Sequence, residues 1–110
     1  MRGFQGKFLF NLIMEKSPAF RFYPQDFISS LDVQMMSGKE VGAYILLLAN
    51  SWIQEEQCFL PDDVEVLRKI ARMTKEEWNV SAIIVLKKFE KKDGKIYNKR
   101  LVTEFKIQQE

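Results

Sequence analysis

The fold is decided by two neighbouring stretches, Thr74-Lys-Glu-Glu77 and the lysine-rich run Phe89-Glu-Lys-Lys-Asp-Gly-Lys-Ile-Tyr-Asn98. The first has the pattern of a capping box, in which the threonine and the glutamate each bond the other's backbone N–H, and it predicts the start of a helix. The Asp-Gly pair in the second predicts a two-residue hairpin turn, because a type I′ turn needs positive φ at both positions. A helix followed directly by a basic hairpin is the outline of a winged helix.

Two further capping signals precede this stretch. Ser37 and Glu40 form a second capping box, and apolar residues at helical spacing behind it predict a long central helix over residues 38–54. Phe59-Leu-Pro61 predicts a short extended segment, and Asp62 is the expected cap of a short helix that ends at Met73. The short connection from that helix to the next is typical of a helix-turn-helix.

The two ends of the chain flank this core. Alternating aromatic residues between Pro18 and Pro24 predict a short edge strand, followed by a turn or short helix at residues 25–31. Asn98 is expected to cap a final helical segment. The predicted fold class is therefore α+β and mostly helical, a winged-helix-like domain with three core helices, a short N-terminal strand and a C-terminal β-hairpin wing. Its predicted parts are an N-terminal extension (1–16), the domain (17–98) and a C-terminal helical segment (99–110).

Charge is unevenly distributed along the chain. The net charge is only +2, but residues 87–100 carry seven basic residues against two acidic ones, which gives +5 for that segment. Such asymmetry is expected of a patch that faces an anion, and equally of a basic face that simply contacts solvent. The candidate nucleic-acid-binding residues are Lys87, Lys88, Lys91, Lys92, Lys95, Lys99 and Arg100.

Several chemistries are disfavoured by composition. A chain without histidine excludes histidine-based triads and the usual zinc sites within itself, and the single Cys58 excludes an internal disulfide. The carboxylates mostly stand where helices begin, where they act as caps rather than acid/base catalysts. The apolar run at residues 8–14 resembles a signal peptide only faintly, because Asn11 interrupts it and no cleavage site follows. We therefore expect a cytoplasmic, non-catalytic protein with no metal or cofactor and no membrane contact.

The helix that begins after Thr74 carries an unusual outward face. With Trp78 and Val85 placed inward, that face has an acidic start followed by Val80, Ile83 and Ile84. Side chains that read base edges are typically Arg, Lys, Asn and Gln, so this face is poorly suited to the major groove. It is better suited to a hydrophobic interface, and these three aliphatic residues are the candidate interface residues.

The order of these motifs resembles a known family. The runs Pro18-Ala-Phe-Arg-Phe-Tyr-Pro-Gln-Asp-Phe27, Met36-Ser-Gly-Lys-Glu-Val-Gly-Ala-Tyr44, Leu60-Pro-Asp-Asp63 and Glu76-Glu-Trp78, with Trp52 between them, are similar to the YdaU-like domain of phage and prophage proteins. The resemblance covers about residues 17–105. It implies a winged-helix-like architecture and a role in phage DNA replication. A replicative helicase or its loader is the partner expected of the second domain that longer relatives carry. The resemblance also implies that Met14 is the usual start, with residues 1–13 upstream of it.

Two functional hypotheses follow from these patterns. In the first, the basic hairpin contacts the DNA phosphate backbone with little sequence specificity, as an accessory to replication initiation. In the second, the domain is a homodimerisation or partner-docking module without direct DNA binding. The sequence leaves open whether a nucleic-acid partner is DNA or RNA and whether it is single- or double-stranded.

Overall fold

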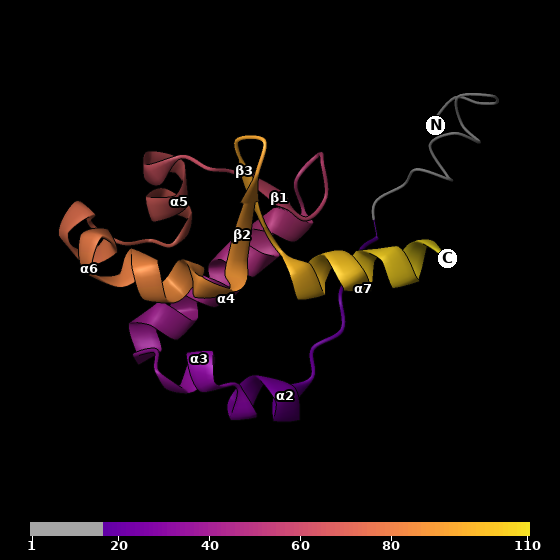
Figure 1. Cartoon of the computed structure of the whole chain (residues 1–110), viewed down its shortest axis with the longest axis horizontal. Coiled ribbons are helices and arrows are strands. Elements are labelled where there is room, and N and C mark those ends of the chain that lie inside the picture. The colour runs from indigo at the N-terminus through magenta and orange to yellow at the C-terminus, as the bar shows by residue number, and fades with distance from the viewer. Residues whose placement is uncertain (1–16) are drawn as a thin grey trace.

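Residues 17–110 are described by the computed structural model, and the predicted extension and the start at Met14 lie outside them. The described elements are, in order, α2 (Pro24–Ser29), α3 (Leu31–Gln34), α4 (Gly38–Trp52), β1 (Phe59–Pro61), α5 (Val64–Ile70), α6 (Lys75–Val85), a 3₁₀ turn η1 (Leu86–Lys88), β2 (Phe89–Lys92), β3 (Lys95–Asn98) and α7 (Lys99–Gln109). The predicted class, α+β and mostly helical, is confirmed. Figure 1 shows the hairpin in front of α4, with α5 and α6 on one side and α7 on the other.

The central helix α4 begins where its capping box predicts. The Ser37 hydroxyl accepts from the Glu40 N–H at 3.1 Å, and the Glu40 carboxylate accepts from the Ser37 N–H at 2.8 Å. The helix then presents Tyr44 and Leu47 to the interior, and Leu47 is completely buried. The main core gathers around this face and includes Leu47, Leu60, Leu67, Trp78, Val85 and Ile96.

The sheet has three antiparallel strands in the order β1-β3-β2. β1 is the short extended segment predicted before the second capped helix, and it pairs with the return strand of the hairpin so that Leu60 lies opposite Ile96. Both of these side chains are buried in the main core. The sheet therefore fixes the hairpin to the helices through β1, although the hairpin is distant from β1 in the sequence.

The cap of α5 lies one residue later than predicted. Asp63, not Asp62, is the N-cap, and its carboxylate accepts from the Val66 N–H at 3.0 Å. The backbone N–H of Asp62 instead donates to the carbonyl of Gly94 at 2.9 Å, at the hairpin turn. A residue whose backbone is held by the end of the sheet is still in the strand connection, so the helix begins after it.

The connection from α5 to α6 is as short as a helix-turn-helix requires. Arg72 adopts a left-handed conformation with φ 60°, which reverses the chain directly after α5. The predicted capping box then starts α6: Thr74 accepts from the Glu77 N–H at 3.1 Å, and Glu77 accepts from the Thr74 N–H at 2.8 Å. The short connection predicted between these two helices is thereby confirmed.

The predicted N-terminal edge strand is wrong, because the described residues contain no strand before Phe59. The Arg21 N–H donates to the Glu104 carboxylate at 3.2 Å instead of to a neighbouring strand. The Phe20 ring packs edge-on against Trp52 with centroids 5.2 Å apart. The alternation of side chains thus reflects an extended segment that packs on α4 and α7. The turn or helix expected after it is confirmed as α2 and α3.

Glu104 is the ionisable group through which α7 binds the N-terminal extended segment. Hydrogen bonds from the Arg21 guanidinium, at 2.9 and 3.0 Å, and then from Gln108 hold the pKa of Glu104 down at about 2, from an ordinary value of 4.5. A lowered carboxyl pKa stabilises the folded state above the unfolded pKa, and that contribution is lost as pH falls through the folded value. The Arg21–Glu104 pair therefore stabilises the fold at neutral pH and fails in acid.

We expect the Glu104→Gln protein to lose part of the acid sensitivity of the wild-type fold. The urea midpoint of the wild type should fall as the pH drops from about 4.5 towards 2, and the variant should start lower at neutral pH and follow a flatter profile. Glu110→Gln, at the exposed chain end, is the control and should follow the wild-type profile. Parallel profiles for wild type and Glu104→Gln would contradict this role.

A second, smaller core lies between α4, α7 and the N-terminal segment. It contains Trp52, Cys58 and Leu101, with Phe105 packed edge-on against Trp52 at 6.2 Å. Burial raises the pKa of the Cys58 thiol to about 11, so the thiol stays protonated and behaves as the small apolar side chain expected from the sequence. Asn98 caps α7 by accepting from the Leu101 N–H at 3.0 Å, as predicted.

Candidate nucleic-acid interface

The basic hairpin has the geometry that its Asp-Gly turn predicts. Asp93 and Gly94 have φ values of 53° and 77°, and Lys92 pairs directly with Lys95 across the turn. Residues directly opposite each other share a face of the sheet, so these two lysines lie on the outer face together with Tyr97. Ile96, on the other face, is buried. The tip of the hairpin therefore presents paired lysines to solvent.

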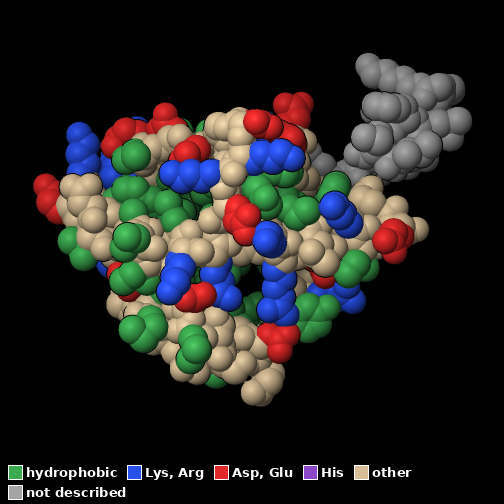
Figure 2. Space-filling view, in the orientation of Figure 1, with side chains coloured by type: hydrophobic (Ala, Val, Ile, Leu, Met, Phe, Trp, Pro, Cys, Tyr) green, Lys and Arg blue, Asp and Glu red, His purple; other side chains and the backbone are tan. Residues whose placement is uncertain are grey.

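Six of the seven predicted basic residues have a carboxylate partner within the described chain. The pairs are Lys87–Asp32 at 3.4 Å, Lys88–Asp32 at 3.9 Å, Lys91–Asp62 at 3.5 Å, Lys99–Glu90 at 3.1 Å, Arg100–Asp26 at 2.5 Å, and Lys95–Glu56. No such pair is recorded for Lys92 among residues 17–110. Figure 2 shows the result: basic and acidic side chains alternate over the hairpin, η1 and the start of α7.

These partners change the electrostatic character of the surface. The segment 87–100 has a charge of +5 by itself, but Asp26, Asp32, Glu56 and Asp62 come from elsewhere in the chain, and counting them lowers the local charge to +1. The surface is thus a field of exposed ion pairs rather than a strongly positive patch. Folding, not local sequence, supplies the negative charges.

The ion pairs are exposed enough to exchange partners. The side chains of Lys91 and Lys99 are each 72% exposed. Lys99 donates a hydrogen bond to Glu90, and this bond together with the charge attraction raises the pKa of Lys99, which is therefore protonated at neutral pH. Exposed pairs of this kind typically contribute about 0–1 kcal/mol, so an incoming phosphate group can displace the carboxylate at little cost.

Two of the three candidate interface residues are exposed, and the third packs against the core. Val80 and Ile83 are 74% and 81% exposed, as expected. Ile84 is half-buried and packs against the main core, so its predicted outward position is corrected. It lies three residues after the buried Ser81, and residues at this spacing share one side of a helix. Only Val80 and Ile83 remain on the open face of α6.

Apolar residues that sequence analysis did not select lie close to this face. Leu31, in α3, and Met35, directly after it, are 77% and 76% exposed. They flank Asp32, which pairs with Lys87, and Lys87 lies one turn after Ile83. In Figure 2 hydrophobic side chains gather over α6 and over the region of α2 and α3. A signal existed in the sequence, since both residues are large and apolar, but nothing local indicated that they would remain exposed.

The described residues hold no cluster of side chains that could bind a metal ion, and none of the described helices is long and apolar enough to cross a bilayer. What they define is a mostly helical α+β domain with a charged hairpin surface. The chain belongs to a family described as a protein of unknown function, DUF1376, whose model matches residues 18–106. Neither the curated proteins nor the solved structures gave a match.

Proposed function

We propose that this protein is a non-catalytic DNA-binding module of a phage or prophage replication system, acting in the cytoplasm at replication initiation. It contacts phosphate groups through the hairpin, η1 and the start of α7, with weak sequence specificity. The observation that carries the proposal is the gathering of seven basic side chains on η1, the hairpin and the start of α7, where exposed or half-buried carboxylates are their only recorded charged partners among the described residues. A replicative helicase or its loader is the partner that the family resemblance adds.

The order of the elements supports this proposal. Helix α4, strand β1, helices α5 and α6 and then the β2–β3 hairpin follow one another, in the order expected of a winged helix. In DNA-binding helix-turn-helix proteins the second helix enters the major groove. Here that helix exposes Val80 and Ile83, which cannot hydrogen-bond to base edges. Phosphate contacts from the hairpin therefore give the interaction its affinity, and base reading contributes little.

Exchange of partners is the expected mechanism. When a lysine leaves a carboxylate for a DNA phosphate, condensed counterions are released from the DNA, which favours the complex at low salt. The released carboxylate then lies beside the DNA and repels it. The carboxylates thus set an upper limit on affinity, and their removal should strengthen binding.

We expect Asp32→Asn combined with Glu90→Gln to bind DNA about tenfold more tightly than wild type, because three cations lose their internal competitors, each worth up to about 1 kcal/mol. Fluorescence anisotropy with a labelled duplex measures the change. Glu76→Gln combined with Glu110→Gln is the matched control, because it alters net charge equally at exposed positions outside these pairs. A gain no larger than that of the control would remove the exchange mechanism.

A second function is favoured by the apolar face of α6 and α3. Val80, Ile83, Leu31 and Met35 are all more than 70% exposed, and single soluble domains rarely expose large contiguous apolar patches. A second copy of the chain is the proposed occupant, because a twofold interface would bury the same residues on both protomers. This face borders Lys87 but does not include the hairpin strands, so the hairpin remains accessible to DNA in a dimer.

A further inference from the structure

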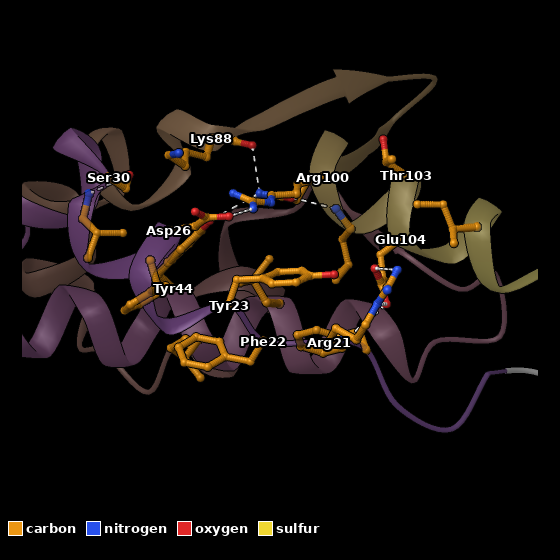
Figure 3. Close-up of a pocket in the computed structure, with 18 residues that line it drawn as sticks. Arg21, Phe22, Tyr23, Asp26, Ser30, Tyr44, Lys88, Arg100, Thr103 and Glu104 are labelled. Atoms are coloured by element: carbon orange, nitrogen blue, oxygen red, sulfur yellow. Dashed lines mark hydrogen bonds and ion pairs between the residues drawn. The ribbon is translucent and has the colours of Figure 1, made fainter.

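A pocket of about 340 Å³ opens between the N-terminal segment, α4 and α7. Figure 3 shows its lining residues, which come from positions distant in the sequence, including Arg21, Tyr44 and Arg100. Aromatic and aliphatic side chains such as Phe27 and Leu48 make up most of its walls. Its volume falls at the small end of the range for ligand sites, which bury an apolar group and orient it with few polar contacts.

The walls of this pocket are fixed by internal bonds. Arg21 makes two hydrogen bonds to Glu104 through its guanidinium, and Gln108 adds a third to the same carboxylate and a fourth to the carbonyl of Ala19. Glu104 is itself buried. The N-terminal wall is therefore held against α7 before any ligand arrives, which lowers the ordering cost of binding.

Cations stand at the mouth of the pocket. Lys88 and Arg100 both line it, and the guanidinium of Arg100 has one recorded hydrogen bond, to Asp26, out of five N–H donors. The Nζ atom of Lys88 lies 3.9 Å from Oδ2 of Asp32, which is too far for a strong hydrogen bond. Both cations thus retain donors for an anionic group placed at the entrance.

A polar group is also available inside. The hydroxyl of Tyr44, which is buried, accepts from the Asn98 amide at 3.4 Å, and no acceptor for its own proton is recorded among the described residues. A carbonyl or carboxylate oxygen of a ligand in the pocket can accept a hydrogen bond from this hydroxyl. The site therefore offers apolar walls, one internal donor and two cations at its mouth.

We infer that this pocket binds an acidic peptide of a partner protein through one bulky apolar side chain, with the flanking carboxylates on Lys88 and Arg100. Three basic and two acidic side chains line the pocket (Arg21, Lys88, Arg100, Asp26 and Glu104), and this excess of one positive charge favours Asp or Glu residues beside the anchor. A peptide is favoured over an unpaired nucleobase because the walls are largely apolar, and a buried base would leave polar edge atoms without partners. This site shares Lys88 and Arg100 with the proposed phosphate-binding surface, but its apolar walls lie outside the hairpin strands.

The test is fluorescence polarisation with a labelled synthetic peptide that has Leu-Phe at its centre and two acidic residues on each side. We expect a dissociation constant on the order of 100 µM or tighter. Replacing Leu-Phe by Ala-Ala, or the acidic residues by lysine, should weaken binding at least about tenfold. Absence of saturable binding up to about 1 mM would refute the inference.

Variants of the protein locate the site. Thr103 lines the pocket from the exposed side of α7. The Thr103→Trp side chain should therefore block the pocket and raise the dissociation constant of the acidic peptide at least about tenfold. Ile45→Glu, on the α4 wall, should have the same effect by charge repulsion. Gln109→Trp adds an equal bulk outside the lining and should bind as wild type does. All three should retain their helical circular dichroism, because the altered side chains are exposed.

Two outcomes contradict the inference. One is peptide binding that is unchanged in both Thr103→Trp and Ile45→Glu. The other is that the Thr103→Trp protein binds a single-stranded oligonucleotide more weakly than wild type does but binds the peptide equally well. That result would assign the pocket to an unpaired base. DNA binding through the hairpin should survive Thr103→Trp, so failure of this inference and failure of the DNA proposal give different results.

Discussion

Replacing Lys91, Lys92 and Lys95 with glutamate should weaken DNA binding by at least about 100-fold. Each replacement removes one phosphate contact and adds repulsion, and three losses of about 1 kcal/mol already correspond to a factor of that size. Lys91 and Lys92 are exposed and Lys95 is half-exposed, so the hairpin should stay folded. The measurement is an anisotropy titration with labelled duplex and single-stranded DNA at about 150 mM salt, where long-range repulsion is screened.

The matched control for this experiment changes the same charge elsewhere. Lys39, Lys69 and Lys75 are exposed and lie on α4, α5 and α6, away from the hairpin strands. Replacing these three with glutamate should cost much less affinity, because long-range repulsion is screened at physiological salt. Equal losses in the two triple variants would mean that net charge alone governs binding, and the hairpin would then have no special role.

The second large effect concerns self-association. Ile83→Asp should shift a dimer to monomer and raise its dissociation constant by at least about 100-fold, because a buried, unpaired carboxylate in an apolar interface costs several kcal/mol. Ile83 is the right position because it is 81% exposed in the protomer, whereas Ile84 contributes to the core. Light scattering coupled to gel filtration gives the mass directly.

A matched variant separates this effect from misfolding. Val64→Asp places the same carboxylate at an exposed aliphatic position of α5, outside the α6 face, and should leave the mass unchanged. Wild-type protein that is monomeric at high concentration, or an Ile83→Asp protein that remains dimeric, would exclude the α6 face as a self-association surface. DNA binding should persist in the Ile83→Asp monomer, although with lower apparent affinity if two hairpins normally act together.

The elements predicted correctly are those with local signals. The capping boxes at Ser37 and Thr74 and the Asp-Gly turn each depend on residues within a few positions of one another, and each has the predicted hydrogen bonds or φ values. The N-terminal segment failed for the opposite reason. Its backbone partner is Glu104, which is 83 residues away, and no local pattern distinguishes an edge strand from an extended segment bonded to a helix.

The candidate site shows the same division. The positions of the seven basic residues could be predicted, since they lie within one short segment that forms η1, the hairpin and the start of α7. The charge of the surface could not, because Asp26, Asp32 and Asp62 reach it only through the fold. The pocket could not be predicted from the sequence either, since its walls combine residues near both ends of the family match. In this protein the segment charge read from the sequence therefore overstates the charge that a ligand meets.

The most direct test of phosphate binding is the salt dependence of DNA affinity, measured by anisotropy from about 50 to 200 mM salt. If the hairpin surface makes about four phosphate contacts, the logarithm of the association constant should fall against the logarithm of salt concentration with a slope of about −3 to −4. The slope should fall to about −1 in the Lys91, Lys92 and Lys95 triple variant, because three of about four contacts are removed. A wild-type affinity that is indifferent to salt, or a slope that the triple variant retains, would contradict phosphate binding by the hairpin.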